Sequence, residues 1–246
     1  MKFTYGKIQH NTSHLIREVQ IRNLNHTSMR EWIIICDFDG TITTKDVSDQ
    51  ILENLATGNW KALADRADAG EISMNECIVR QFEMLPANPE KWIRIAEQIP
   101  LRHGLKEFLE WSRKVDLPLI CISAGLKPII RHYQKKHGWS FPIIAPEIQF
   151  IEGSVKVIPP PFSEEYRDFK EHHVRELQKN GKKVIYIGDG GSDQNAIVHA
   201  DIRCVVQGST LEQALEQKGI HFLAFKEFAD LQKTLDRFLS KKTENH

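Results

Sequence analysis

Three short apolar segments of this sequence each end in small and polar residues, and this pattern constrains the fold most. Residues 32–36, 117–122 and 183–187 are followed by Asp37-Phe38-Asp39-Gly40, Ser123-Ala124-Gly125 and Gly188-Asp189-Gly190-Gly191. Short runs rich in β-branched residues are typical of parallel strands that are buried on both faces. In open α/β sheets, ligands bind at the carboxyl ends of such strands. If the three strands are neighbours, their polar ends therefore belong to one site.

The intervening segments complete an α/β pattern. Residues 202–206 and 221–225 are further strand candidates, and residues 149–157 are typical of a hairpin. About residues 44–100 have helical patterning, with Asp46 and Ser73 at N-cap positions. We therefore predict a Rossmann-like three-layer α/β core with a parallel sheet, into which a small α-helical domain is inserted.

This pattern divides the chain of 246 residues into four parts, and the length fits one large domain with a smaller one. We expect a polar N-terminal extension over 1–30, an α/β core over 31–43 and 101–240, a helical insertion over 44–100, and a tail over 241–246.

The composition excludes several classes of protein. Lys plus Arg and Asp plus Glu each total 33, so the chain lacks the excess positive charge of a protein that binds nucleic acid by bulk electrostatics. No apolar stretch approaches the roughly 18 residues that a membrane span requires, and the N-terminal segment lacks the apolar centre of a secretory signal. The four cysteines form no CxxC pair, which argues against a zinc site and favours reduced thiols in the cytoplasm.

Four aspartates follow the first and third strands. Asp37 and Asp39 are two residues apart, so their side chains project to the same side. Asp189 and Asp193 are four residues apart at a predicted helix start, which stacks them one turn apart. Hard oxygen ligands at this density suit Mg2+. A turn that simply reverses the chain at Asp39 is the plainer alternative for the first pair, but it does not explain a carboxylate directly against a buried strand.

Ser123 and Lys170 indicate a functional site only in combination with these carboxylates. Ser123 and the two residues after it offer a hydroxyl and backbone N–H groups that can hold a phosphate, although Ser123 alone would be a plain helix cap. Lys170 lies in a charged segment and alone would be a solvated surface residue. Together the parts describe phosphoryl transfer, in which a metal ion and a lysine offset the repulsion between a carboxylate and a phosphate dianion. Asp37 would attack phosphorus, and Asp39 would protonate the leaving alkoxide and then deprotonate water.

The order and spacing of these residues resemble the haloacid dehalogenase (HAD) superfamily of phosphatases. Residues 37–41 match its first motif, Ser123 its second, Lys170 its third and residues 188–193 its fourth. The resemblance covers residues 31 to about 240. It implies that the chain is a phosphoric monoester hydrolase that forms an aspartyl-phosphate.

The resemblance also implies roles for these residues. Asp37 would be the nucleophile and Asp39 the general acid/base, which Thr41 helps to position. The phosphoryl group would be held by Ser123, Ala124, Gly125 and Lys170. Mg2+ would be bound by Asp37, the backbone carbonyl of Asp39 and Asp189, with Asp193 in support.

The helical insertion resembles the C1 cap of the phosphoserine phosphatase branch. Within that branch the chain resembles the MtnX-like phosphatases of methionine salvage, through DFDGTIT, Asp46 and the segment 80–86. This implies 2-hydroxy-3-keto-5-methylthiopentenyl-1-phosphate as the substrate. Phosphoserine is the alternative, because Asp46 stands near the place of a glutamate that contacts the substrate ammonium in phosphoserine phosphatases. Arg80 could bind a carboxylate or the phosphate in a closed state, or it could be a helix-surface arginine.

Two other functions would use the same scaffold. A phosphotransferase would pass the phosphoryl group to an acceptor other than water, and an inactive member would only bind a ligand. A closing cap excludes water and bulk, which favours a small phosphorylated metabolite as the partner, with no nucleic acid and no membrane. We expect a monomer or a homodimer.

Overall fold

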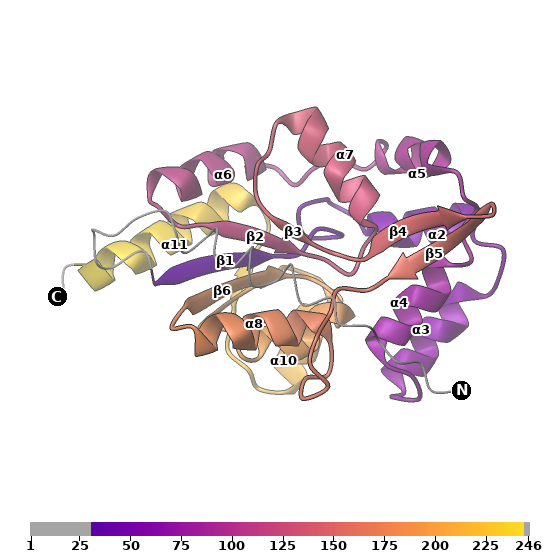
Figure 1. Cartoon of the computed structure of the whole chain (residues 1–246). Helices are drawn as coiled ribbons and strands as arrows, with labels where there is room; N and C mark the ends of the chain where they lie inside the picture. The colour runs from indigo at the N-terminus through magenta and orange to yellow at the C-terminus, as the bar shows by residue number, and fades with distance from the viewer. Residues whose placement is uncertain (1–30, 244–246) are drawn as a thin grey trace.

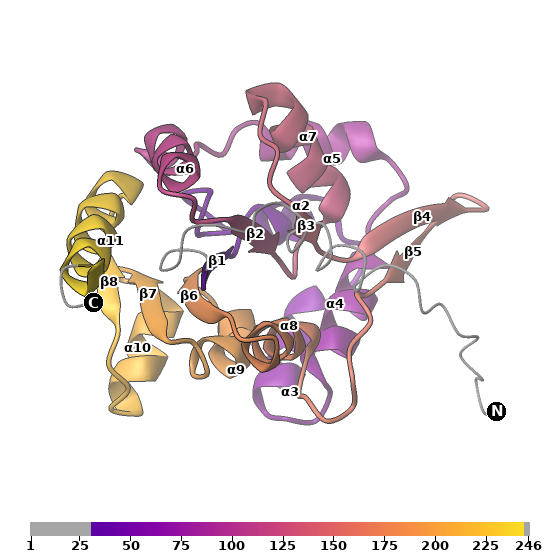
Figure 2. The ribbon, with the colours of Figure 1, turned by 60° about the vertical axis from the view of Figure 1, so that its left-hand side comes forward.

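The computed structural model describes residues 31–243, whose centre is a six-stranded parallel sheet with the order β3-β2-β1-β6-β7-β8 (Figures 1 and 2). The strands are β1 (Trp32–Cys36), β2 (Leu119–Ile122), β3 (Ile143–Ile144), β6 (Lys183–Gly188), β7 (Ile202–Val206) and β8 (Leu223–Phe225). The three apolar runs of the sequence are the adjacent strands β2, β1 and β6. Cys36 at the end of β1 pairs with Cys121 and Ile187, so the polar segments after the three strands meet at one edge.

Helices cover both faces of the sheet (Figure 2). One face carries α6 (Leu105–Lys114), α7 (Lys127–His137) and α11 (Phe228–Thr243), and the other carries α8 (Phe169–Lys179), α9 (Gln194–Ile197) and α10 (Thr210–Gln217). All five residues of β1 are buried, as expected for a central strand between two helical layers. The predicted Rossmann-like three-layer fold is confirmed.

Four helices lie between β1 and α6: α2 (Val47–Leu55), α3 (Trp60–Asp68), α4 (Met74–Phe82) and α5 (Pro89–Ala96). The Asp46 carboxylate accepts a hydrogen bond from the Asp49 N–H at 2.7 Å and so caps α2, and Ser73 caps α4 in the same way. The chain leaves and re-enters the sheet layer through one antiparallel bridge between Thr43 and Leu101. These helices lie beyond the carboxyl ends of the strands (Figure 1).

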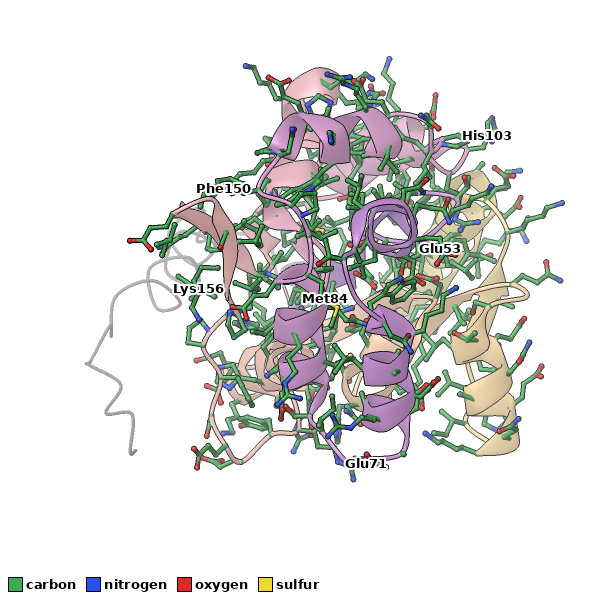
Figure 3. The ribbon with its side chains drawn as sticks, turned by 90° about the vertical axis from the view of Figure 1, so that its right-hand side faces the viewer. Glu53, Glu71, Met84, His103, Phe150 and Lys156 are labelled. Carbon is green, nitrogen blue, oxygen red and sulfur yellow. The ribbon has the colours of Figure 1, made fainter. Side chains whose placement is uncertain are left out.

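The predicted hairpin is formed by β4 (Glu147–Ile151) and β5 (Ser154–Ile158). Its two loop residues, Glu152 and Gly153, both have positive φ, as a tight two-residue turn requires. The Phe150 ring lies 5.6 Å from that of Trp92 in α5, and the Lys156 ammonium lies 3.3 Å from the Glu83 carboxylate after α4. The hairpin therefore contacts the helical insertion from the side (Figure 3).

Two expectations concern the membrane and the cysteines. None of the helices within residues 31–243 combines the length and the apolar character that a membrane crossing requires. All four cysteines are free and buried, so Cys36, Cys121 and Cys204 are core residues, as their apolar surroundings predict. The predicted extension over 1–30 and positions 244–246 of the predicted tail lie outside the described residues.

His173 is a buried ionisable residue within the α8 layer. Its side chain is 4% exposed, and Nε2 has no hydrogen-bond partner among the described residues. Burial and the neighbouring His172 lower the pKa of His173 to about 3, against the opposing charge of Glu176. The imidazole therefore stays neutral while the protein is folded.

We predict that this histidine makes the fold sensitive to acid. Below about pH 6.5 His173 binds a proton in the unfolded chain but not in the folded protein. The contribution of His173 to the unfolding free energy therefore falls as the pH decreases. Between pH 7 and pH 5 wild type should lose up to about 2 kcal/mol more unfolding free energy than His173→Gln. Urea unfolding of both proteins at the two pH values measures the difference. Equal losses would contradict the prediction.

Candidate active site

The loop after β1 presents two aspartates on one side of the chain. Phe38 between them is fully buried, which turns Asp37 and Asp39 away from the core. The Phe38 N–H donates to Asp37 Oδ1 at 2.7 Å and holds that carboxylate in place. Gly40 follows with a φ of 70°, and a Cβ at this position would collide with the Asp189 carboxylate. The turn therefore requires glycine for its conformation and for space.

Arg102 supports this loop from the side opposite the carboxylates. Its guanidinium donates to the carbonyl oxygens of Gly40, Thr41 at 2.8 Å, Thr43 at 3.4 Å and Lys226 at 3.1 Å. Five donors in a rigid fork suit such a set of acceptors. Arg102 therefore ties the loop after β1 to the segment before α11.

Lys170 is the buried positive charge of the site. Its side chain is 1% exposed, and Nζ lies 2.9 Å from Asp37 Oδ2 and 2.7 Å from Asp193 Oδ1. It also donates to Ser192 Oγ at 2.9 Å. Burial alone would lower the pKa of Lys170, but the two carboxylates raise it above its ordinary value. The alternative of a solvated surface lysine is therefore wrong.

Asp193 connects the fourth motif to Lys170. Oδ1 accepts from the Lys170 ammonium and from the Tyr186 hydroxyl at 2.7 Å, and Oδ2 accepts from the N–H groups of Asp189 and Gly190 at 3.1 Å. Four donors leave this carboxylate little capacity for a further partner. Its geometry suits the positioning of Lys170 and of the glycine-rich loop.

Asp39 has a different environment. Oδ1 accepts from the N–H groups of Val47 and Ser48 at 3.1 and 3.3 Å, at the start of α2. Oδ2 accepts from the hydroxyls of Ser48 at 3.2 Å and Ser123 at 3.4 Å. Burial raises the pKa of Asp39 to about 6, although the hydrogen bonds from Ser48 and Val47 oppose this shift. Such a carboxyl can hold or release a proton near neutral pH.

Carboxylate oxygens of Asp37, Asp189 and Asp193 lie within 4.8 Å of one another. Burial and the charge of Asp193 raise the pKa of Asp189 to about 7 and that of Asp37 above its ordinary value. The hydroxyl of Thr41 donates to Asp189 Oδ1 at 2.6 Å. The single positive charge of Lys170 thus does not balance the three carboxylates. Their oxygen atoms are donors that fit a hard divalent cation.

The segment after β2 approaches Asp39 through its backbone. The Gly125 N–H donates to Ser123 Oγ at 2.9 Å, and a Cβ on Gly125 would collide with the Asp39 carboxylate. Helix α7 begins only at Lys127, so Ser123, Ala124 and Gly125 form a loop before the helix and not its first turn. All three residues line the same cavity.

This cavity has a volume of about 980 Å³ and lies between the strand ends and helices α2–α4. Asp46 is on its wall, whereas Arg80 is not: the Arg80 guanidinium lies 2.7 Å from the Glu76 carboxylate on the outside of α4. Thr41 is fully buried and contacts Asp189, not Asp39 as the resemblance implied, because its side chain faces the end of β6.

Several residues of the site have no signal in the sequence. Three of them are single polar residues in segments without a motif. The fold brings Arg102 to the loop after β1, Tyr186 to Asp193 and Arg167 to the cavity wall. Ser48 could have been found, because a serine at the start of a helix capped by Asp46 is within reach of the preceding loop.

Comparisons with known proteins agree with this geometry. A sequence model of the haloacid dehalogenase-like hydrolase family matches residues 34–197. The "2-hydroxy-3-keto-5-methylthiopentenyl-1-phosphate phosphatase" of Bacillus pumilus is 26% identical over 85% of this chain and 93% of its own. The "Bifunctional enzyme MtnB/MtnX" of Bacillus licheniformis is 28% identical over 85% of this chain, but this chain spans only 50% of that protein.

A solved structure shares the fold. The "Phospho-Aspartyl Intermediate Analogue of Phosphoserine phosphatase" superposes with a TM-score of 0.62 at 17% identity, over 84% of this chain and 98% of the other. At this identity the likeness concerns the arrangement of the helices and strands alone.

We predict that Arg102 is needed for stability. Arg102→Met keeps the aliphatic part of the side chain but leaves four carbonyl oxygens without their donor, which should lower the unfolding free energy by about 2 to 4 kcal/mol. Arg94→Met is the matched control, because Arg94 is 76% exposed and its pair with Glu90 spans 3.8 Å. Urea unfolding compares the two, and equally small losses would contradict the role of Arg102.

Proposed function

This chain belongs to the haloacid dehalogenase-like hydrolase family, it is a phosphoric monoester hydrolase, and we propose that it uses Mg2+ and an aspartyl-phosphate intermediate to hydrolyse a small phosphomonoester. One observation carries the proposal: the two aspartates after β1 have opposite environments. Asp37 lies 2.9 Å from the buried Lys170 ammonium, whereas Asp39 has no ion-pair partner among the described residues and accepts hydrogen bonds from neutral N–H and O–H groups. The nearby ammonium favours the ionised form of Asp37, so the two neighbouring carboxyls can take the separate roles of nucleophile and proton donor.

In the proposed first step, an oxygen of Asp37 forms a bond to phosphorus and the bond to the leaving alkoxide breaks. Asp39 transfers its proton to that alkoxide, which lowers the barrier for its departure. In the second step Asp39 takes a proton from water, the water oxygen binds phosphorus and the bond to Asp37 breaks. In this proposal Lys170, Ser123 and the Gly125 backbone would contact the phosphoryl oxygens.

Mg2+ would be held by Asp37, Asp189 and the backbone carbonyl of Asp39, with Asp193 behind them. It would supply positive charge beside the phosphoryl oxygens, where Lys170 alone does not balance the carboxylates. The support for this assignment is the oxygen donor set and the raised pKa values of Asp37 and Asp189.

We also propose that residues 44–100 act as a cap on a core formed by 31–43 and 101–240. Helices α2–α4 provide one wall of the cavity, and the strand ends provide the other. A wall of this kind limits the size of the substrate and excludes water from the reacting atoms. A small phosphorylated metabolite is therefore the proposed partner. The cytoplasmic setting and the monomeric or dimeric state stay predictions.

For the substrate we propose 2-hydroxy-3-keto-5-methylthiopentenyl-1-phosphate or a close analogue. The names of two relatives support this choice, and so do the apolar side chains of Trp60, Met74 and Phe82 on the cap side of the cavity, which suit a methylthio tail. Phosphoserine is the alternative, because Asp46 lies on the same wall.

We predict that Asp37→Asn removes catalysis. The amide cannot attack phosphorus as a carboxylate does, so hydrolysis of p-nitrophenyl phosphate should fall on the order of a thousandfold or more. Asp65→Asn, on the exposed side of α3, is the control and should keep wild-type rates. Phosphate release reports both, and an active Asp37→Asn protein would exclude the aspartyl-phosphate mechanism.

We predict that Mg2+ raises the thermal midpoint of the metal-free wild-type protein, because an ion bound only by the folded state stabilises it. At ten times the dissociation constant the gain is about 1.4 kcal/mol. Asp189→Asn should lose most of this shift, and EDTA should abolish hydrolysis by wild type. An unchanged Mg2+ shift in Asp189→Asn would remove Asp189 from the metal site.

A further inference from the structure

Every charged side chain that residues 46–82 contribute to the cavity wall is a carboxylate. Asp46, Asp49 and Asp68 lie on this wall, and its other members from the same segment are uncharged, with Trp60 and Phe82 among the larger ones. None of the three carboxylates forms an ion pair with a residue that the structure describes. This side of the cavity therefore combines apolar surface with negative charge.

The basic residues of the same segment do not line the cavity. Its three basic residues are each paired with a glutamate outside the wall: Lys61 with Glu53 at 2.9 Å, Arg66 with Glu71 at 3.0 Å and Arg80 with Glu76 at 2.7 Å. The segment thus has cations available, but its own glutamates engage them. The negative sign of the wall results from this sorting of charges between the two sides of the helices.

The cations of the core are at the phosphate end. Lys170 is held by Asp37 and Asp193, and Arg167 precedes it by three residues. Arg167 is the one basic side chain among the described wall residues, and its Nη1 lies 3.3 Å from Oδ1 of Asn195, which follows the fourth motif. The basic side chains in or beside the cavity therefore come from the core, and residues 46–82 contribute none to the described wall.

We propose that the leaving group of the substrate is an alcohol without a carboxylate, and that Asp49 and Asp68, together with Asp46, exclude phosphomonoesters that carry one. This inference rests on the proposed function and defines its substrate class. A substrate carboxylate on this wall would meet like charges and apolar surface with no cation to pair with. Hydroxyl groups, in contrast, can donate to the aspartate oxygens. Discrimination by an unfavourable contact is a common basis of specificity.

The carboxylates of this wall distinguish between the methionine-salvage compound and phosphoserine. The methionine-salvage compound carries hydroxyl, keto and methylthio groups and no carboxylate, which fits the wall. Phosphoserine carries a carboxylate beside its ammonium, and the wall offers only the ammonium a favourable contact. The charge of the cap side therefore favours the first candidate.

Matched pairs of phosphomonoesters test the inference on the full-length protein with Mg2+. O-phosphoethanolamine and O-phosphoserine differ by one carboxylate, and glycerol 3-phosphate and 3-phosphoglycerate differ by a hydroxymethyl group in place of one. Each compound is measured as a substrate and as an inhibitor of p-nitrophenyl phosphate hydrolysis. The member without a carboxylate should be preferred by about tenfold or more in kcat/KM or in inhibition constant.

The variant Asp49→Asn/Asp68→Asn should reduce this preference by about threefold or more through a gain on the carboxylated member, because the like charges are removed. Asp65→Asn, which lies on α3 but not on the wall, should leave the preference as it is. Equal treatment of both members by wild type, or an unchanged preference in the double variant, would overturn the inference while p-nitrophenyl phosphate is still hydrolysed. Absence of all turnover, the aryl phosphate included, would overturn the proposed function and the inference with it.

Discussion

The ammonium group of Lys170 is buried between the carboxylates of Asp37 and Asp193, and the geometry of the site depends on this contact. A buried charge is tolerated only when it is paired and hydrogen-bonded, so the three groups hold one another in place. The contact joins the end of β1, the first turn of α8 and the segment after β6. Removing either carboxylate would leave a buried ammonium short of a partner. The three segments are therefore positioned by electrostatics as much as by the packing of the sheet.

Asp39 lies two residues from Asp37 but is held in another way, by N–H groups of α2 and by two hydroxyls. Its hydrogen-bond donors are neutral, and burial raises its pKa to about 6 against these hydrogen bonds and the charge of Lys170. Glycines at 40 and 125 allow the carboxylates and the backbone to approach closely. Two aspartates of one loop thereby acquire separate environments, as the proposed nucleophile and proton donor would require.

The cavity above these residues has two ends of opposite character. The core side contributes Arg167 and Asp37, behind which the Lys170 ammonium lies, and residues 46–82 contribute carboxylates and apolar side chains. The same helices that close the cavity also sort their charges, since their basic residues pair with glutamates on the outer side. In the proposed mechanism, recognition of the phosphoryl group would fall to the core and selection of the leaving group to the inserted helices.

The sequence by itself determined which residues follow each strand, because the apolar periodicity and the glycine-rich turns are local. The neighbouring strands β2, β1 and β6, the hairpin, and the helical character of the insertion were predictable for this reason. The two-residue strand β3 and the helix α3 were not singled out. The first is too short for a pattern, and the second is capped by Asn59 but buries only Leu63, so its apolar pattern is weak. Only the tertiary structure decided the partners: Thr41 on Asp189, Arg102 under the loop of Gly40, Tyr186 on Asp193, and Arg80 on Glu76 outside the cavity. The contacts of Thr41 and Arg102 join residues far apart in the chain, and a polar side chain does not encode which distant group will meet it when the sheet and its helices close. The contacts of Tyr186 and Arg80 are closer in sequence, but only the fold shows whether they face the cavity.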